Sequence, residues 1–214
     1  YGCLGLDTYG SKSVALGYNA LSTQNFTTAT DSHNTAVGYN TMGGLTTGLR
    51  NTAVGAYSMD GTLTGDDNTS MGYSAGDALT SGSDNVNVGS YAGDASTEGN
   101  NNVVMGYYAL SADTKGSNNI AVGRYALKVQ NFTTATNSYN VAIGYDVGAL
   151  ITTGVENTLI GSLVGDSLVD ADENTAVGKS ALTADTYGSR STAIGQGTLA
   201  TQNFGTATQT YNTA

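Results

Sequence analysis

The chain has no proline and no tryptophan, and among its 214 residues it has only one cysteine and one histidine. Because Cys3 has no second cysteine to pair with, the fold does not rest on an internal disulfide, and cysteine content says nothing of the compartment. No run of about 18 apolar residues occurs, so the sequence predicts no membrane insertion. The first residues also lack the basic and then apolar layout of a signal peptide.

Charged residues make up only 11% of the chain, and its formal net charge is −10. A chain with this charge and without a basic patch is a poor partner for nucleic acid, whose phosphates it would repel. Large aliphatic residues are scarce, whereas Gly, Thr, Asn, Ser and Ala are abundant. This composition is not that of an ordinary enzyme, and it indicates a repeat architecture that needs little core in each unit.

One short phrase returns along the whole sequence, as NTAVG at 34–38, NTAVG at 51–55 and NTSMG at 68–72. Its glycine recurs after 17 residues, or after 21 in the longer units. Such regularity predicts a stacked repeat protein, with one repeat domain of about twelve coils over residues 1–214. Since the pattern is under way at both ends, we expect a fragment of a longer fibre. The marker glycines are Gly17, Gly38, Gly55, Gly72, Gly89, Gly106, Gly123, Gly144, Gly161, Gly178 and Gly195.

The order of residues within the phrase predicts a β-strand. Its first residue is Asn in ten of twelve copies, its second is always β-branched, and its fourth is a large aliphatic residue or Met. Such residues suit a pleated strand, and a helix would not accept a glycine after every four of them. We expect each coil to contain this strand, a second short strand after the glycine and a polar turn. Stacked coils then form an all-β parallel β-solenoid or β-roll with strands about 4.8 Å apart.

The second and fourth residues of the phrase share one face of the strand, and the third, mostly Ala, faces the other way. We assign the fourth residue to the interior of the coil and expect the alanine face to lie against a neighbouring chain, because a strand that is apolar on both faces is covered on both. The predicted repeat core is Val37, Val54, Met71, Val88, Met105, Val122, Ile143, Ile160, Val177 and Ile194.

A rough energy comparison also favours association. Ordering the residues of one coil costs about 25 kcal/mol, and its apolar side chains contribute roughly 6–12 kcal/mol on burial. The sequence therefore predicts an obligate oligomer of identical chains, for which we prefer threefold symmetry. The alternative is a monomeric solenoid whose alanine face stays in water.

Three of the units are longer and contain one cassette, QNFTTAT at 24–30 and 130–136 and QNFGTAT at 202–208. Phe26, Phe132 and Phe204 are the only phenylalanines of the chain. An aromatic residue in a loop that bulges from a uniform rod is a candidate surface contact. The alternative is that each ring packs beneath its own loop.

The phrases NTAVG, SVALG and STAIG, with the continuation GYNAL at 17–21, resemble the head repeats of trimeric autotransporter adhesins and the repeats of bacteriophage tail-fibre proteins. The resemblance spans the chain and implies a left-handed parallel β-roll that assembles as a homotrimer. It also implies a structural, non-catalytic segment of an extracellular or virion fibre that attaches to a host surface receptor or glycan. We favour the phage fibre, because no membrane-anchor barrel, coiled-coil stalk or neck is present; the head of a bacterial surface adhesin is the alternative.

Catalytic chemistry finds little support in the sequence. His33 occupies a turn position that other copies fill with residues such as Arg50 and Asp67, so we expect a solvated turn residue and no general base. A polysaccharide-cleaving tailspike needs a unique pair of carboxylates. Asp60, Asp77 and Asp94 instead recur at one repeat position, which indicates turn chemistry. We therefore expect no enzyme.

Two binding functions remain as alternatives. The acidic turns TGDDN, TSGSDN and VDADEN could offer oxygens to a structural Ca²⁺ ion, but they match no calcium-binding loop, and we expect no cofactor. An ice-binding solenoid needs an unbroken threonine ladder on one flat face. Thr35, Thr52 and Thr69 give way to Val86 and Val103 at the same position, which favours interchangeable core residues.

Overall fold

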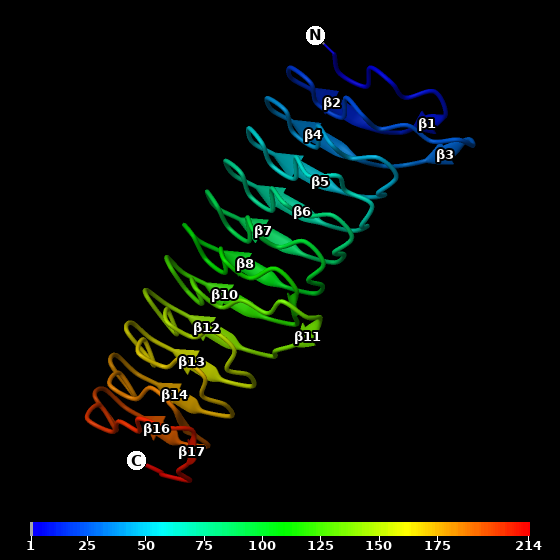
Figure 1. Ribbon diagram of the computed structural model, residues 1–214. Helices are drawn as coiled ribbons and strands as arrows, with labels where there is room; N and C mark the ends of the chain where they lie inside the picture. The colour runs from blue at the N-terminus through cyan, green and yellow to red at the C-terminus, as the bar shows by residue number, and fades with distance from the viewer. Residues whose placement is uncertain (1) are drawn as a thin grey trace.

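The computed structural model, which describes residues 2–214, shows a rod of stacked coils with the chain termini at opposite ends (Figure 1). One strand from each coil joins an 11-stranded parallel sheet in which the order of strands follows the chain. A bridge between Thr192 and Thr213 adds a twelfth rung. The predicted all-β parallel solenoid of about twelve coils is confirmed. The strands of this sheet are β2 Val14–Leu16, β4 Thr35–Val37, β5 Thr52–Val54, β6 Thr69–Met71, β7 Val86–Val88, β8 Val103–Met105, β10 Ile120–Val122, β12 Val141–Ile143, β13 Thr158–Ile160, β14 Thr175–Val177 and β16 Thr192–Ile194.

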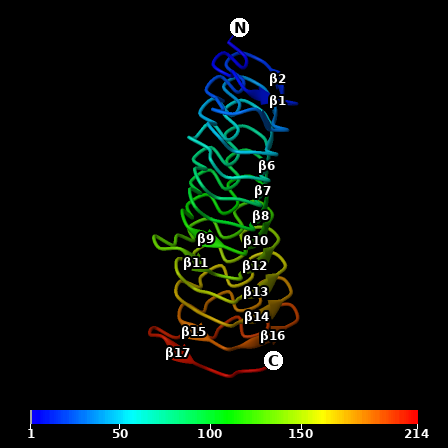
Figure 2. The same cartoon turned by 90° about the vertical axis from the view of Figure 1, so that its right-hand side faces the viewer.

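The register of the sheet is unbroken along the rod, so that Ala121 pairs with Val104 on one side and Ala142 on the other. The 21-residue units keep this register because their extra residues leave the coil as arms. Each arm is closed by a short parallel pair, and the arms of β9–β11 and β15–β17 project from the same side of the rod (Figure 2). The pairs are β1 Gly10–Ser11 with β3 Thr30–Asp31, β9 Gly116–Ser117 with β11 Thr136–Asn137, and β15 Gly188–Ser189 with β17 Thr208–Gln209.

The expected second strand after each marker glycine does not form within residues 2–214. The chain there makes tight turns, and its residues alternate into the left-handed region, as at Asn40 (φ 51°) and Met42 (φ 49°). The marker glycine begins this bend. Gly89 has φ 125°, and a Cβ at this position would lie 2.8 Å from the carbonyl oxygen of Gly106 in the next coil. Both the backbone conformation and the close stacking therefore require glycine.

The interior of the coil is filled by the third residue of the phrase and by side chains from the turns. Ala36, Ala53 and Ala121 are fully buried, and so are turn residues such as Leu21 and Leu182. The assignment of the fourth residue to the coil interior is therefore wrong. A coil of 17 residues encloses so little space that a small strand residue opposite a leucine fills it. The larger side chains point outward, as Val37, Val54, Met71, Val88, Met105, Val122, Ile143, Ile160, Val177 and Ile194 do.

The first residue of the phrase forms a buried ladder of asparagines along the rod. The backbone N of Asn102 donates to Asn85 Oδ1 (3.0 Å), and its side-chain Nδ2 donates to the carbonyl of Gly116 (3.0 Å). Its own Oδ1 accepts from the backbone N of Asn119 in the next coil (2.9 Å). These bonds satisfy buried main-chain groups at the corner of each coil, which explains why Asn dominates this position.

Candidate interaction face and loops

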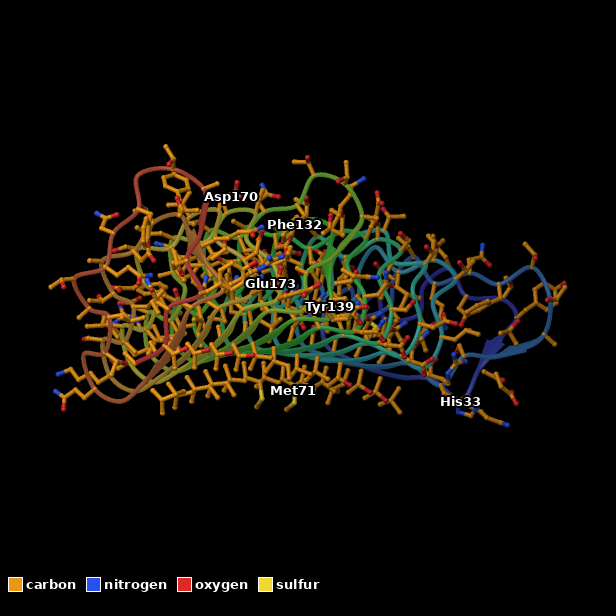
Figure 3. The ribbon with its side chains drawn as sticks, turned by 90° about the horizontal axis from the view of Figure 1, so that it is seen from below. His33, Met71, Phe132, Tyr139, Asp170 and Glu173 are labelled. Atoms are coloured by element: carbon orange, nitrogen blue, oxygen red, sulfur yellow. The ribbon has the colours of Figure 1, made fainter. Side chains whose placement is uncertain are left out.

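The outer face of the 11-stranded sheet presents two columns of side chains, the second and fourth residues of the phrase. The fourth residue is aliphatic or Met in every strand, and neither column contains a charged residue. Many of these side chains are open to solvent, including Leu16 (66% exposed), Met71 (45%) and Ile194 (54%). Met71 lies in the continuous row of outward side chains along the sheet (Figure 3). With strands about 4.8 Å apart, eleven strands make an apolar face roughly 48 Å long.

The column formed by the second residue also points outward. Thr35, Thr52 and Thr69 are partly exposed neighbours in the sheet, so the expectation that they are core residues is wrong. Their hydroxyls make the N-terminal third of the face more polar than its centre, where Val103 and Ile120 occupy the column. The column returns to threonine at Thr158, Thr175 and Thr192, so the face is most apolar at its centre.

A ladder of tyrosines borders this face on the side that follows the marker glycine. The sequence analysis did not identify this ladder, because its members occupy the first residue after the glycine in some units and the second in others. The signal is nevertheless present, since every unit from Gly17 to Gly144 has a tyrosine at one of these positions. Ring centroids of successive members lie 4.6–6.3 Å apart. The ladder comprises Tyr18, Tyr39, Tyr57, Tyr73, Tyr91, Tyr107, Tyr108 and Tyr125.

Two cations close the C-terminal end of the ladder. The guanidinium of Arg124 lies 4.4 Å from the ring centroid of Tyr125 and 5.7 Å from that of Tyr145, and Lys128 Nζ lies 4.7 Å from the Tyr125 ring. Arg124 donates to the Tyr125 hydroxyl, and this bond raises the pKa of the guanidinium. Cation–π contacts of this kind stabilise exposed aromatic stacks by about 0.5–1 kcal/mol.

The opposite border of the face is formed by the corner residues that precede the buried asparagines. Many of these corner residues are charged. Arg50 pairs with Asp67 (2.6 Å) and Arg190 with Glu173 (3.0 Å), in each case between adjacent coils. The hydrogen bond from Arg50 lowers the pKa of the Asp67 carboxyl. His33 occupies the same corner with φ 51°, exposed at the surface (Figure 3), as expected for a turn residue.

Two of the three cassette phenylalanines do not provide a surface contact. Phe26 and Phe132 are only 6% and 7% exposed, and Phe204 is partly buried. The identification of these rings as contact residues is therefore wrong for Phe26 and Phe132, and the alternative of a ring packed beneath its loop is right. What the arms expose is the sequence after the ring, such as Thr133, Thr134 and Ala135.

A carboxylate holds each arm in place, and the sequence analysis missed it; Asp113 and Asp185 are buried, and Asp7 is partly buried. Asp113 Oδ2 accepts from Gln130 Nε2 (2.6 Å), and Asp113 Oδ1 accepts from the backbone N of Phe132 (3.1 Å). Gln130 Oε1 then accepts from Asn140 of the asparagine ladder (2.8 Å). Burial raises the pKa of Asp113. The signal is present in the sequence, because the aspartate of a DTYGS or DTKGS segment stands 17 residues before the glutamine of each cassette.

The acidic residues of the coil turns stack in one column, as Asp60, Asp77 and Asp94. Partial burial raises the pKa of Asp60 and of Asp94 to about 6, and it also raises the pKa of Asp77. Asp94 Oδ1 is buried and accepts no hydrogen bond. Among residues 2–214, no three His, Cys, Asp or Glu side chains converge on a position where a metal ion could sit.

A small polar pocket lies where the C-terminal arm meets the rod, lined by Glu173, Arg190 and Gln209 among others. Within the described part of the chain, no helix has the length and hydropathy that crossing a membrane requires. No known family profile, curated protein or solved structure matches the sequence or the fold.

Proposed function

We propose that the chain is a structural, non-catalytic segment of an extracellular or virion fibre and that it works as a homotrimer attached to a host surface. The observation that supports this proposal is the apolar outer face. Monomeric soluble proteins rarely expose contiguous apolar patches above about 300–600 Å². Since the strands are three residues long, the face is about 10 Å wide and roughly 48 Å long. Its area of about 480 Å² lies in the upper part of that range, where an apolar patch often marks an interaction site.

Parallel sheets are normally covered on both sides, and here the coil covers only the inner side. The strands are three residues long, so each chain offers a narrow strip of two columns. Three such strips close around a common axis that runs along the rods, with the tyrosine border of one chain beside the charged border of the next. This arrangement keeps the threefold symmetry expected from the sequence. The chains now meet through the face of the second and fourth residues of the phrase, and not through the alanine face.

The association is tested by sedimentation of the purified chain together with two substitutions on adjacent residues of β8. Met105→Lys places a charge on the outer face, and we expect it to yield a folded monomer. Val104→Lys, whose side chain is 1% exposed, should instead unfold the coil. A wild-type chain that sediments as a stable monomer would refute the trimer.

Attachment is assigned to the arms, which stand clear of the face and expose Thr and Ala. The test is binding of the labelled oligomer to bacterial cells and to animal cells, with a variant in which residues 131–134 are deleted to give a 17-residue coil. Binding to bacteria that decreases when the arm is deleted supports a phage fibre. Binding to animal cells alone supports the adhesin alternative. Binding to neither surface argues against attachment.

An ice-binding role is the second candidate, and the outward threonine column favours it. Thr35, Thr52 and Thr69 lie on one flat face with the spacing of the sheet. A folded monomer with thermal hysteresis, lost in Thr52→Tyr, would establish this role in place of the trimer.

A further inference from the structure

The ring contacts of the tyrosine ladder are of three kinds: parallel, edge to face and, at Tyr125, tilted. The rings of Tyr91 and Tyr108 are nearly parallel, at 13° and 4.6 Å between centroids, and those of Tyr18 and Tyr39 are parallel at 10° and 5.3 Å. The contacts between them along the ladder, such as Tyr57 with Tyr73 at 74°, are edge to face. Only in a parallel pair do equivalent ring carbons of the two residues face each other.

We propose that Tyr91 and Tyr108 form a site of oxidative cross-linking, where hydrogen peroxide and a haem peroxidase join the two phenols as dityrosine. The pair lies in adjacent coils, with the backbone N of Tyr91 bonded to Tyr73 O and that of Tyr108 bonded to Ser90 O. These main-chain bonds fix both residues, so the two rings meet without any rearrangement of the rod. Both rings are partly open to solvent.

The chemistry needs only the two phenols and the oxidant. Each phenol loses one electron and one proton to give a phenoxyl radical, whose unpaired electron is shared with the ortho carbons. The two radicals combine in a bond between ortho carbons, and the hydrogen on each of these carbons moves to the phenolic oxygen. The product has two hydrogen atoms fewer than the tyrosines, and peroxide accepts them to form two molecules of water.

Geometry selects this pair over its neighbours. Holding two reacting groups in contact replaces a bimolecular encounter, which gives a large rate advantage when the reacting atoms are aligned. Tyr107 also lies 4.6 Å from Tyr108, but their rings are perpendicular, at 90°. The ortho carbons of that pair do not face each other. The expected order of yields is therefore Tyr91–Tyr108 first, Tyr18–Tyr39 second and the edge-to-face pairs last.

The test uses the purified full chain at low concentration, treated with a haem peroxidase and hydrogen peroxide. A protease that cleaves before aspartate separates Tyr91 from Tyr108 at Asp94, so a cross-link joins the peptides 84–93 and 94–112. We expect dityrosine fluorescence in the band of single-chain mass on a denaturing gel. The linked peptide should appear in the mass spectrum, two hydrogen atoms lighter than the sum of its parts.

Tyr108→Phe keeps the ring in the stack but removes the phenol, and we expect it to abolish the 84–93 to 94–112 link. Tyr107→Phe is the matched control, because it alters the same peptide and should leave the link in place. The proposal fails if the wild-type link is absent while edge-to-face pairs react. It also fails if Tyr107→Phe removes the link and Tyr108→Phe retains it. Circular dichroism of both variants checks that the rod is intact.

Discussion

Glycine and asparagine hold the two corners of each coil, and each does so for a different physical reason. The marker glycine adopts a backbone conformation that other residues resist, and it leaves no room for a Cβ beneath the next coil. The asparagine is required for its amide, which offers both a donor and an acceptor to buried main-chain groups. Ser191, which stands at this position in one coil, keeps the backbone bond to Asn174 Oδ1, and its hydroxyl accepts from Gln202 Nε2.

Gly89→Ala should destabilise the folded rod by at least about 3 kcal/mol, since it combines backbone strain with a clash against Gly106. The matched control is Gly205→Ala, because a Cβ there meets nothing within 4 Å and Gly205 is not in the left-handed region. Urea unfolding followed by circular dichroism measures both. Equal effects of the two substitutions would contradict the account of the marker glycine.

Asn102→Ala should cost about 3 kcal/mol or more, because it removes the side-chain partner of the Gly116 carbonyl and of two buried donors of Asn119, its backbone N and its Nδ2. Asn137→Ala is a suitable comparison, since this exposed residue accepts only one side-chain bond, from Asn118. We expect a change below about 1 kcal/mol for it. If the ladder did not stabilise the rod, Asn102→Ala and Asn137→Ala would unfold at the same urea concentration.

At the scale of the element, a coil is a strand, a run of turns and a polar corner, and the sequence predicts only part of it. The 17-residue period and the strand follow from the glycine spacing. The inner and outer faces could not be told apart by alternation, because Ala53 on one face and Val54 on the other are both apolar. Size was the usable signal: the third residue is mostly Ala, as a narrow interior requires, whereas the fourth varies among Val, Met and Ile.

The carboxylates that anchor the arms and the tyrosine ladder were missed for another reason. Both depend on residues in different coils, such as Asp113 and Gln130, which are 17 residues apart and meet only after the chain is wound. Reading one unit at a time does not show them, but aligning the units beneath one another does. In the structure Phe132 stands two residues after the buried Gln130 and is itself buried.

The stacked carboxylates predict a stability that depends on pH. Asp94 has a folded pKa of about 6, above its ordinary value of 3.8, so the unfolded chain ionises first as the pH rises. The stability present at pH 4 is therefore reduced as the pH passes 6, by about 1 kcal/mol for this half-buried group. The unfolding temperature of Asp94→Asn, measured as a function of pH, should not show this part of the fall in stability. Asp84→Asn, which removes an exposed carboxylate, should keep it.

At the scale of the whole molecule, the rod is quasi-one-dimensional, since each coil contacts only its neighbours. The sheet is continuous along the rod, but the apolar interior is not. Buried Ser70 and Asn87 separate it into an N-terminal and a C-terminal cluster. The continuous outer face therefore gives the rod its single extended surface, and any partner that covers it must match its full length.

This architecture predicts the effect of removing one coil. Deletion of residues 69–85 joins Asn68 to Val86, preserves the register and should leave a folded, shorter rod. Deletion of residues 69–84 removes one residue fewer, which turns inner side chains outward in the junction coil. Circular dichroism and resistance to proteolysis should distinguish the two deletions. If both deletions unfold the chain alike, the coils are not the independent units described here.

The asparagine ladder also gives the rod a direction. Within the ladder, from Asn34 to Asn174, each Oδ1 accepts from the coil that follows it in the sequence and never from the coil before. In a nascent chain that has wound its first coils, the Oδ1 of the last ladder asparagine is therefore free to accept a hydrogen bond from the next asparagine that leaves the ribosome. Winding can then keep pace with translation, each finished turn acting as the template for the one being made.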